Sequence, residues 1–297
     1  MRSPKLLVPG DTVAIVSTAR KVSSKELEAA SSLLENWGLK TVLGKTIEAE
    51  DNQFAGNDNL RASDFQEMLD NPEIKAIWCA RGGYGTVRII DQLDFTKFKN
   101  TPKWVIGYSD ITVLHSHIHN MGIETLHAQM PVDIESKTEA SRSSIKKALF
   151  GEEYTITIPS EKNDRVGTVS GQLVGGNLSI LYSLCGSPSA LNTNGKILFI
   201  EDLDEYLYHI DRMTQNLKRN GMFVHLKGLI VGGMSQMNDN AIPFGKTATE
   251  IILDVCKDYD FPIAFNFPAG HLDDNRALIL GREVILEVNN KKVILNF

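Results

Sequence analysis

The pentapeptide GYSDI, residues 107–111, places a serine where a nucleophile would be exposed. It follows the short apolar run 104–106 and precedes the helix-like stretch 111–121. A serine at a glycine-flanked turn from a strand to a helix is typical of a nucleophile elbow, although Ile111 stands where that motif has its second glycine. The turn would lift the Ser109 hydroxyl above the sheet and aim the backbone N–H of Asp110 at a developing oxyanion. The alternative interpretation is that these two residues only cap the helix.

A serine nucleophile needs a base, and the base needs an orienting carboxylate. His271 lies in the sequence FPAGH, in a turn after the apolar run 263–266, which suits a general base at a strand end. The alternative is an ordinary surface histidine. Glu201 follows the apolar run 197–200, where a carboxylate is costly unless it is paired. Glu201 is therefore the first candidate for the orienting acid, and Asp202 is the second.

The chain order of these candidates predicts a site between two domains. The serine lies in the first half of the chain, and the acid and base lie in the second half, so the site would be an interdomain cleft. The loop RGGYG, residues 81–85, could add backbone N–H donors near Gly83 to an oxyanion hole. It could also cradle a phosphate, but it lacks the Lys-Ser/Thr of a P-loop. Arg81 could bind a substrate carboxylate or form a structural salt bridge.

No metal or cofactor is expected. His115, His117 and His119 resemble a metal cluster, but on a helix only the first and last share a face. The glutamate of an H-E-x-x-H motif is missing between them. The three cysteines are far apart in the sequence, without metal-binding spacing, which predicts free thiols in a reducing compartment.

Composition and length indicate an ordinary globular protein, either of two domains or of one large α/β domain. The chain has 297 residues, of which 42% are hydrophobic and 23% charged, and its net charge is −6. Nucleic acid is an unexpected partner because the chain has no basic tract. Membrane insertion is also not expected, since no apolar run approaches the roughly 18 residues of a span. The default location is the cytoplasm.

The first half of the chain alternates strands and helices, which predicts parallel βαβ units with right-handed crossovers. Both glycine-rich loops fall at the carboxyl ends of strands, where such sheets bind ligands. The predicted strands are residues 12–17, 41–43, 74–80 and 104–108, and the predicted helices are residues 24–37, 59–69, 87–93 and 111–121.

The second half mixes strands and helices less regularly, which indicates an α+β domain with a partly closed sheet. We expect an N-terminal domain at 1–150, a linker at 151–166 and a C-terminal domain at 167–297. The predicted strands are residues 154–158, 167–173, 197–200 and 263–266; the predicted helices are residues 177–184, 206–218 and 246–256; a hairpin is expected within residues 282–297.

Five motifs in order give the chain a resemblance to a known family. They are RGGYG at 81–85, GYSDIT at 107–112, GGNLS at 175–179, FIEDLDE at 199–205 with YHIDR at 208–212, and PAGH at 268–271. Each motif alone is weak, but all five in this order are specific. Over nearly its whole length the chain resembles the LD-carboxypeptidase (muramoyltetrapeptide carboxypeptidase) family of serine peptidases.

The resemblance implies an N-terminal flavodoxin-like or glutamine-amidotransferase-like α/β domain with a parallel sheet, and a smaller β-rich C-terminal α+β domain. It implies a Ser-Glu-His triad on Ser109, Glu201 and His271, the three residues reached above. Family oxyanion donors map to backbone N–H groups near Gly83 and at Asp110. The implied protein is a metal-free, cytoplasmic homodimer that removes the terminal D-Ala from murein tetrapeptides in cell-wall peptide recycling.

Substrate contacts and the exact substrate stay open. Arg81, Asn177 of the GGNLS motif and Arg212 are candidates for binding the small peptide substrate, the two arginines through a carboxylate. A related branch hydrolyses microcin-type peptidyl-adenylates with the same triad and is longer around the cleft, so this compact chain favours the carboxypeptidase branch. An inactive peptide- or nucleotide-binding protein is a further alternative. A glutamine amidotransferase would need cysteine in place of Ser109.

Overall fold

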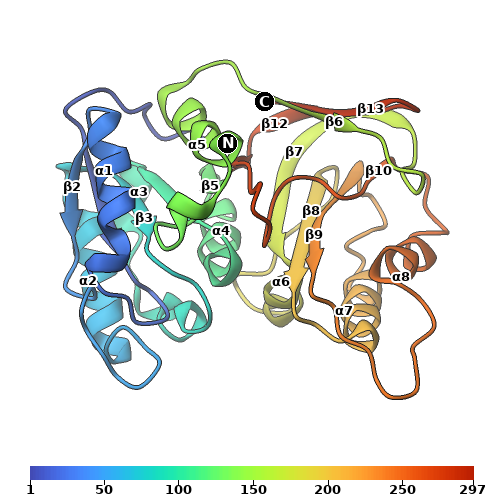
Figure 1. Ribbon diagram of the computed structural model, residues 1–297, viewed down its shortest axis with the longest axis horizontal. Helices are drawn as coiled ribbons and strands as arrows, with labels where there is room; N and C mark the ends of the chain where they lie inside the picture. Colours follow the sequence, from blue (N-terminus) through green and yellow to red (C-terminus); the bar gives the residue numbers. More distant parts are fainter.

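The computed structural model describes residues 1–297 and shows two lobes side by side (Figure 1). Each lobe is built on its own sheet, of six strands in the first lobe and seven in the second. No helix has both the length and the apolar character needed to cross a bilayer. The parallel strands of both sheets point to the same side of the molecule, the lower side in Figure 1, so their carboxyl ends meet there.

The first sheet has the strand order β11-β5-β4-β3-β1-β2, and its five N-terminal strands are parallel, as the βαβ pattern predicts. The sixth strand, β11, pairs antiparallel with β5 and comes from near the other end of the chain, so this sheet is not made by residues 1–150 alone. The bounds are β1 Thr12–Val16, β2 Lys40–Leu43, β3 Ile74–Cys79, β4 Trp104–Gly107, β5 Thr125–His127 and β11 Leu278–Leu280.

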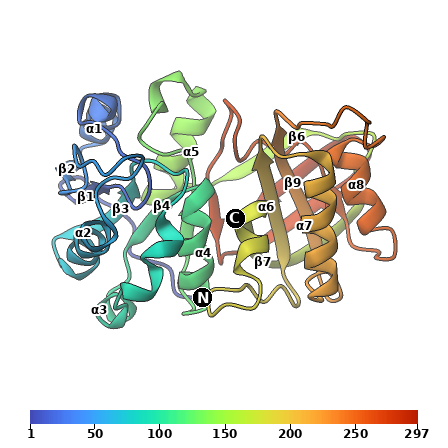
Figure 2. The same ribbon diagram turned by 90° about the horizontal axis from the view of Figure 1, so that it is seen from below.

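Helices cover both faces of the first sheet. Helices α1 (Glu28–Asn36) and α5 (Glu139–Phe150) lie on one face, and α2 (Asp58–Asp70) and α3 (Thr96–Asn100) lie on the other (Figure 2). Buried apolar side chains of α1 and α5 join one core, and those of α2 and α3 join another, which gives three layers. The α/β fold class predicted for this half is confirmed.

The second sheet has the order β10-β9-β8-β7-β12-β13-β6, in which β7 to β10 are parallel and β12, β13 and β6 are antiparallel. Its strands are β6 Thr155–Pro159, β7 Gly167–Asn177, β8 Ile197–Leu203, β9 Gly228–Ser235, β10 Ile263–Ala264, β12 Glu283–Val288 and β13 Lys292–Asn296. Three helices pack in one core against this sheet: α6 Leu178–Leu184, α7 Leu207–Arg219 and α8 Ala248–Val255.

Several elements differ from the sequence prediction. The predicted helix 87–93 is two short 3-10 turns, η2 (Thr86–Arg88) and η3 (Ile90–Gln92). The strand predicted at 154–158 is confirmed as β6, and it lies within the segment 151–166 that was expected as a linker and pairs with β13 at the sheet edge. Strands β5, β9 and β11 and helices α3 and α5 lie outside the predicted elements. They depend on pairing and packing between distant segments, which local periodicity does not reveal.

The two lobes meet at helix α4 (Thr112–His119), which faces α6 (Figure 2). The Thr112 hydroxyl accepts a hydrogen bond from the backbone N–H of Asn177 at 3.0 Å. Gly176 has φ +145° in the same contact, and a Cβ built there would lie 2.5 Å from the Thr112 hydroxyl oxygen. Only glycine allows this approach, which fixes the helix after Ser109 against the second lobe.

Candidate active site

Ser109 lies at a strained turn between β4 and α4. The strand ends at Gly107, a 3-10 turn η4 covers Ser109–Ile111, and α4 follows, so the predicted strand–turn–helix context is confirmed. Ser109 has φ +61°, a left-handed conformation that costs about 1–3 kcal/mol in a non-glycine residue. Neither Ser109 nor Asp110 is the N-cap of α4, which is Ile111 without a side-chain cap, so a purely capping role is wrong.

The loop RGGYG packs directly on this turn. A Cβ built on Gly82 would lie 3.3 Å from the Ser109 Cβ and 3.4 Å from its Oγ. Asp110 is almost fully buried, and its Oδ2 accepts a hydrogen bond from the backbone N–H of Thr86 at 2.8 Å. Burial raises the pKa of the Asp110 carboxyl, while hydrogen bonding from Thr86 opposes that rise. Asp110 therefore ties the glycine-rich loop to the serine turn through its side chain.

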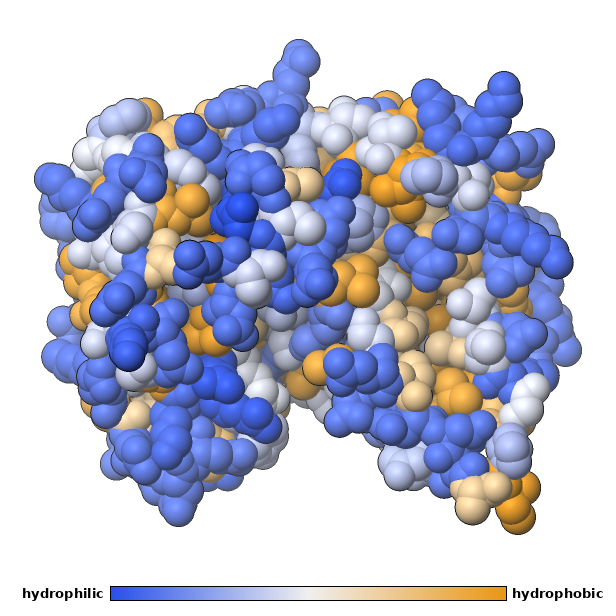
Figure 3. Space-filling model, viewed as in Figure 1, coloured by the Kyte–Doolittle hydropathy of each residue, from blue (hydrophilic) through white to orange (hydrophobic).

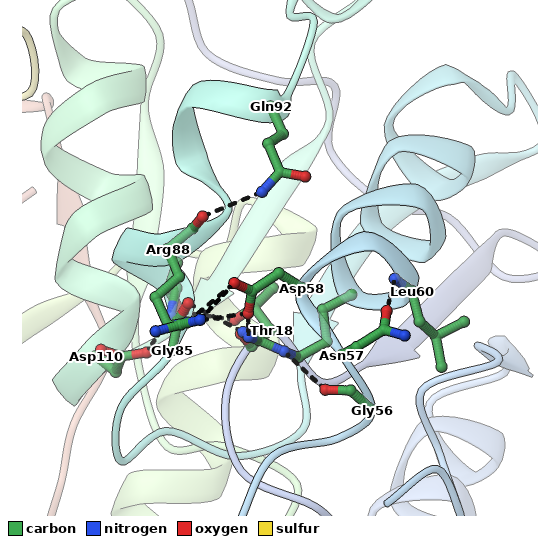
Figure 4. Close-up of polar contacts among 11 residues, drawn as sticks. Thr18, Gly56, Asn57, Asp58, Leu60, Gly85, Arg88, Gln92 and Asp110 are labelled. Carbon is green, nitrogen blue, oxygen red and sulfur yellow. Dashed lines mark hydrogen bonds and ion pairs between the residues drawn. The ribbon is translucent and has the colours of Figure 1, made fainter. Parts of the chain in front are cut away.

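A buried cation also contacts this loop, within a polar network that includes Thr18, Asp58 and Gly85 (Figure 4). Arg61 on α2 is fully buried and donates hydrogen bonds to the carbonyl oxygens of Thr18 at 2.5 Å and Gly85 at 2.9 Å. Asp58 pairs with Arg61 and also accepts hydrogen bonds from Arg88, at 3.0, 3.0 and 2.7 Å. The sequence prediction missed this network because charged residues on an amphipathic helix are normally expected at its solvent face.

Glu201 and His271 form a hydrogen-bonded pair in the second lobe. The Glu201 Oε2 accepts from His271 Nδ1 at 2.7 Å and from the His271 backbone N–H at 3.1 Å. Glu201 is fully buried in β8, two residues before the strand ends rather than at its end, and its Oε1 has no hydrogen-bond partner. Burial disfavours the charged imidazolium and lowers the pKa of His271. The Glu201 carboxylate stabilises the imidazolium more strongly, so the pKa of His271 is raised above its ordinary 6.5.

The PAGH turn is shaped to hold this pair. Gly270 has φ +102°, and a Cβ built there would lie 2.5 Å from the Glu201 Oε2. The Gly270 N–H donates to the Oδ1 of the buried Asn275 at 2.8 Å, which fixes the turn. Gly270 thus provides both the backbone conformation and the space that the Glu201–His271 contact needs.

Tyr108 brings the two lobes together at the site. Its ring lies 4.8 Å from the His271 ring, centroid to centroid, at an interplanar angle of 57°. Because Tyr108 directly precedes Ser109, this contact places the serine turn beside the imidazole. The His271 side chain has its one hydrogen bond with Glu201 and none with the Ser109 Oγ. The sequence analysis did not predict a role for Tyr108 in the site. Its position directly before Ser109 was the one signal in the sequence that could have indicated it.

Two of the three helix histidines have separate hydrogen-bond partners, whereas the buried His119 Nδ1 has none. His115 is buried, and its ring nitrogens lie 2.8 Å from the Thr125 hydroxyl and 2.9 Å from the Gly107 carbonyl oxygen. It therefore fastens α4 to the end of β4, just before Ser109. His117 contacts the Ser189 hydroxyl at 2.9 Å. No group of three or more His, Cys, Asp or Glu side chains is arranged to hold a metal ion.

The three candidate substrate-binding residues lie in different settings. Arg81 is 38% exposed and has a loose ion pair with Glu26 at 3.4 Å, so most of its donors are free. Asn177 is buried, caps α6 and donates to Asp202 Oδ1 at 2.9 Å, so its side chain is committed to structure. Burial, together with the nearby Glu201, raises the pKa of Asp202 to about 7. Arg212 is exposed on α7.

Models of two protein domains match the chain. The LD-carboxypeptidase N-terminal domain matches residues 13–128, and the LD-carboxypeptidase C-terminal domain matches residues 170–286. A Bacillus subtilis protein named probable murein peptide carboxypeptidase is 35% identical over 302 residues, covering 98% of this chain and 93% of its own. The chain belongs to the LD-carboxypeptidase family and is a serine-type carboxypeptidase, a hydrolase.

Two further relatives differ in their named functions. The microcin self-immunity protein MccF of Escherichia coli is 28% identical over 327 residues, with 97% of this chain and 93% of that protein covered. The crystal structure of muramoyltetrapeptide carboxypeptidase from Oxalobacter formigenes has 25% identity and a TM-score of 0.87, covering 96% of this chain and 97% of that one. The family thus contains relatives named for both candidate substrates.

Proposed function

We propose that this protein is an L,D-carboxypeptidase that removes the terminal D-alanine from murein tetrapeptides during cell-wall peptide recycling. The observation that carries the proposal is the buried Glu201–His271 pair beside a strained serine turn, in a member of this family. The names of the Bacillus subtilis and Oxalobacter formigenes relatives support a murein peptide as substrate. We further propose that the protein acts as a cytoplasmic homodimer, as the family resemblance implies.

In this mechanism Ser109 attacks the carbonyl carbon of the bond before the terminal D-alanine. His271 takes the serine proton at Nε2, because its Nδ1 is engaged by Glu201, and returns the proton to the leaving amine. Glu201 holds the imidazole tautomer and stabilises the imidazolium. Water then hydrolyses the acyl-enzyme with His271 as base, which releases the tripeptide and restores Ser109.

The oxyanion formed in each step would be stabilised by backbone N–H groups near Gly83 and at Asp110. A donor of this kind typically contributes about 3–4 kcal/mol to transition-state stabilisation. The contacts of Asp110 and Arg61 with the glycine-rich loop support a rigid oxyanion hole, since preorganised donors need no rearrangement during the reaction. Arg81 is proposed to bind a substrate carboxylate with its free donors.

A second candidate function is the hydrolysis of peptidyl-adenylates, which the likeness to the microcin self-immunity protein favours. The two functions would use the same triad, so only substrates separate them. Purified protein would be incubated with a murein tetrapeptide, with the same peptide ending in L-alanine, and with a peptidyl-adenylate. Release of D-alanine alone supports the carboxypeptidase. Cleavage of the adenylate alone would assign the second function.

A further inference from the structure

Two tyrosines and an arginine at the start of α7 form an exposed group that the catalytic mechanism does not use. The rings of Tyr206 and Tyr208 lie 5.5 Å apart at an interplanar angle of 35°. The guanidinium of Arg212 lies 5.2 Å from the centre of the Tyr208 ring. Tyr206 is 43% exposed and Tyr208 is 39% exposed, so substantial aromatic surface faces solvent. We call these three residues the tyrosine platform.

The tyrosine platform lies at the rim of the candidate active site. Helix α7 begins on the side of the molecule where β8 and β9 end, and in Figure 3 the surface is notched on that side between the two lobes. Hydrogen bonds connect Asp204, two residues before the platform, to the turn that carries His271. The Ser235 hydroxyl donates to the His271 carbonyl at 2.8 Å, and the Asp204 N–H donates to the Ser235 carbonyl at 3.0 Å. The backbone of Tyr206 forms an isolated parallel β-bridge with Asn238.

The length of the proposed substrate determines where its sugar would lie. Tyr206 follows Glu201 by five residues, which span at most about 18 Å when fully extended. In a muramoyl tetrapeptide, three residues separate the sugar from the bond that is cut, and they span about 10 Å when extended. A substrate whose terminal peptide bond lies at Ser109 would therefore place its sugar about 10 Å away, beyond the residues that react.

The charged residues around the platform favour one kind of ligand ring over another, a sugar or a nucleobase. Three carboxylates are its neighbours in the chain, Asp204, Glu205 and Asp211, of which Glu205 is paired with His209 at 2.6 Å. Carboxylate oxygens accept hydrogen bonds from sugar hydroxyls, whereas they repel the phosphate of an adenylate. A tyrosine ring offers an apolar face of the right size for one face of a pyranose. These three carboxylates outnumber the one guanidinium of the platform, Arg212, and so favour a neutral, hydroxyl-rich ring over a nucleotide.

We propose that the tyrosine platform binds the amino-sugar ring of a muramoyl peptide and so determines a preference for peptides that still carry the sugar. This inference rests on the proposed carboxypeptidase function. It adds a subsite that contacts no reacting atom, and it assigns Arg212 to support of the Tyr208 ring rather than to a substrate carboxylate. Tyr206 is the residue on which the preference depends most, because it is the most exposed member of the tyrosine pair.

The test compares kcat/KM for D-alanine release from a muramoyl tetrapeptide and from the free tetrapeptide. The wild type should prefer the muramoyl form by about five- to tenfold, the scale of one aromatic stacking contact. Tyr206→Ala should remove this preference and leave turnover of the free tetrapeptide unchanged, while Tyr206→Phe should retain it. Ile285→Ala, which truncates an exposed residue of β12, is the matched control and should behave as wild type.

Each other outcome has a defined meaning. Equal turnover of both substrates by the wild type, or an equal loss for both in Tyr206→Ala, would overturn the sugar subsite and leave the carboxypeptidase function standing. Cleavage of neither substrate by folded wild type would overturn both proposals. Inhibition by adenosine monophosphate that Tyr206→Ala abolishes would assign the platform to a nucleobase instead.

Discussion

Replacement of Glu201 by glutamine tests how much catalysis depends on the negative charge beside His271. One carboxylate oxygen, Oε2, accepts from both the backbone N–H and the Nδ1 of His271. Glutamine can keep both hydrogen bonds only with its carbonyl oxygen in that position. Its NH2 group then takes the buried place of Oε1, which has no partner in the wild type. The imidazole tautomer is preserved, so the substitution removes mainly the charge.

The expected loss follows from the change in hydrogen-bond type. A hydrogen bond to a charged group contributes about 1.5–3 kcal/mol and a neutral one about 0.5–1.5 kcal/mol, a difference of about 1–2 kcal/mol. That difference corresponds to a decrease in kcat of about 5- to 30-fold. It is far below the roughly 10⁴-fold loss seen when a triad histidine is held in the wrong tautomer.

The pH profile should shift in a direction fixed by the environment of His271. Burial lowers its pKa and the Glu201 carboxylate raises it, with a net rise above 6.5. As a general base, His271 must be neutral, so kcat/KM is lost as pH falls through this pKa. Without the Glu201 charge, burial and Lys137 lower the pKa of His271 against the smaller opposing effect of Asp202, so the acid limb should move to lower pH in Glu201→Gln.

The assay is D-alanine release from a murein tetrapeptide between about pH 5 and 8, where histidine titrates. Glu205→Gln is the matched control, because Glu205 also pairs with a histidine, His209, but outside the triad. Its acid limb should not move. An acid limb in Glu201→Gln that stays in place or moves to higher pH would refute the reasoning, as would a 10⁴-fold loss of kcat.

Three further substitutions have defined expectations. Gly270→Ala should lower kcat by more than tenfold with the fold intact by circular dichroism, because its Cβ would lie 2.5 Å from the Glu201 Oε2; full activity would contradict this. Phe199→Ala should lower the free energy of unfolding in urea by about 3–5 kcal/mol, since Phe199 is fully buried, and a loss under about 1 kcal/mol would be inconsistent with that packing. Arg81→Ala should raise KM or cut kcat/KM; unchanged kinetics would remove its proposed carboxylate contact.

The sequence predicts the parts of the site that depend on residues close together in the chain. The residues GYSDI specify a turn between a strand and a helix, and the structure confirms it around Ser109. A carboxylate within the apolar strand β8 needs a partner, which made Glu201 conspicuous, and His271 is that partner in the structure. That these three residues perform catalysis stays a prediction until it is measured.

Contacts between distant segments could not be read from the sequence. Arg61 resembles a solvent-facing helix residue, yet it is buried because backbone carbonyls from two separate loops converge on it. Strand β11 is only three residues long, and it is a strand because β5 offers an unpaired edge. The packing of Tyr108 on His271 depends on how the two lobes meet. Each of these features arises from tertiary packing, which overrides local propensity.

The most direct measurement is mass spectrometry of free D-alanine released from a murein tetrapeptide by the wild type and by Ser109→Ala. The proposed mechanism predicts release by the wild type and none by the variant, with both proteins folded. Equal release by both proteins would contradict the assignment of Ser109 as the nucleophile. Release by neither would contradict the proposed substrate, and a peptidyl-adenylate would then be the substrate to test.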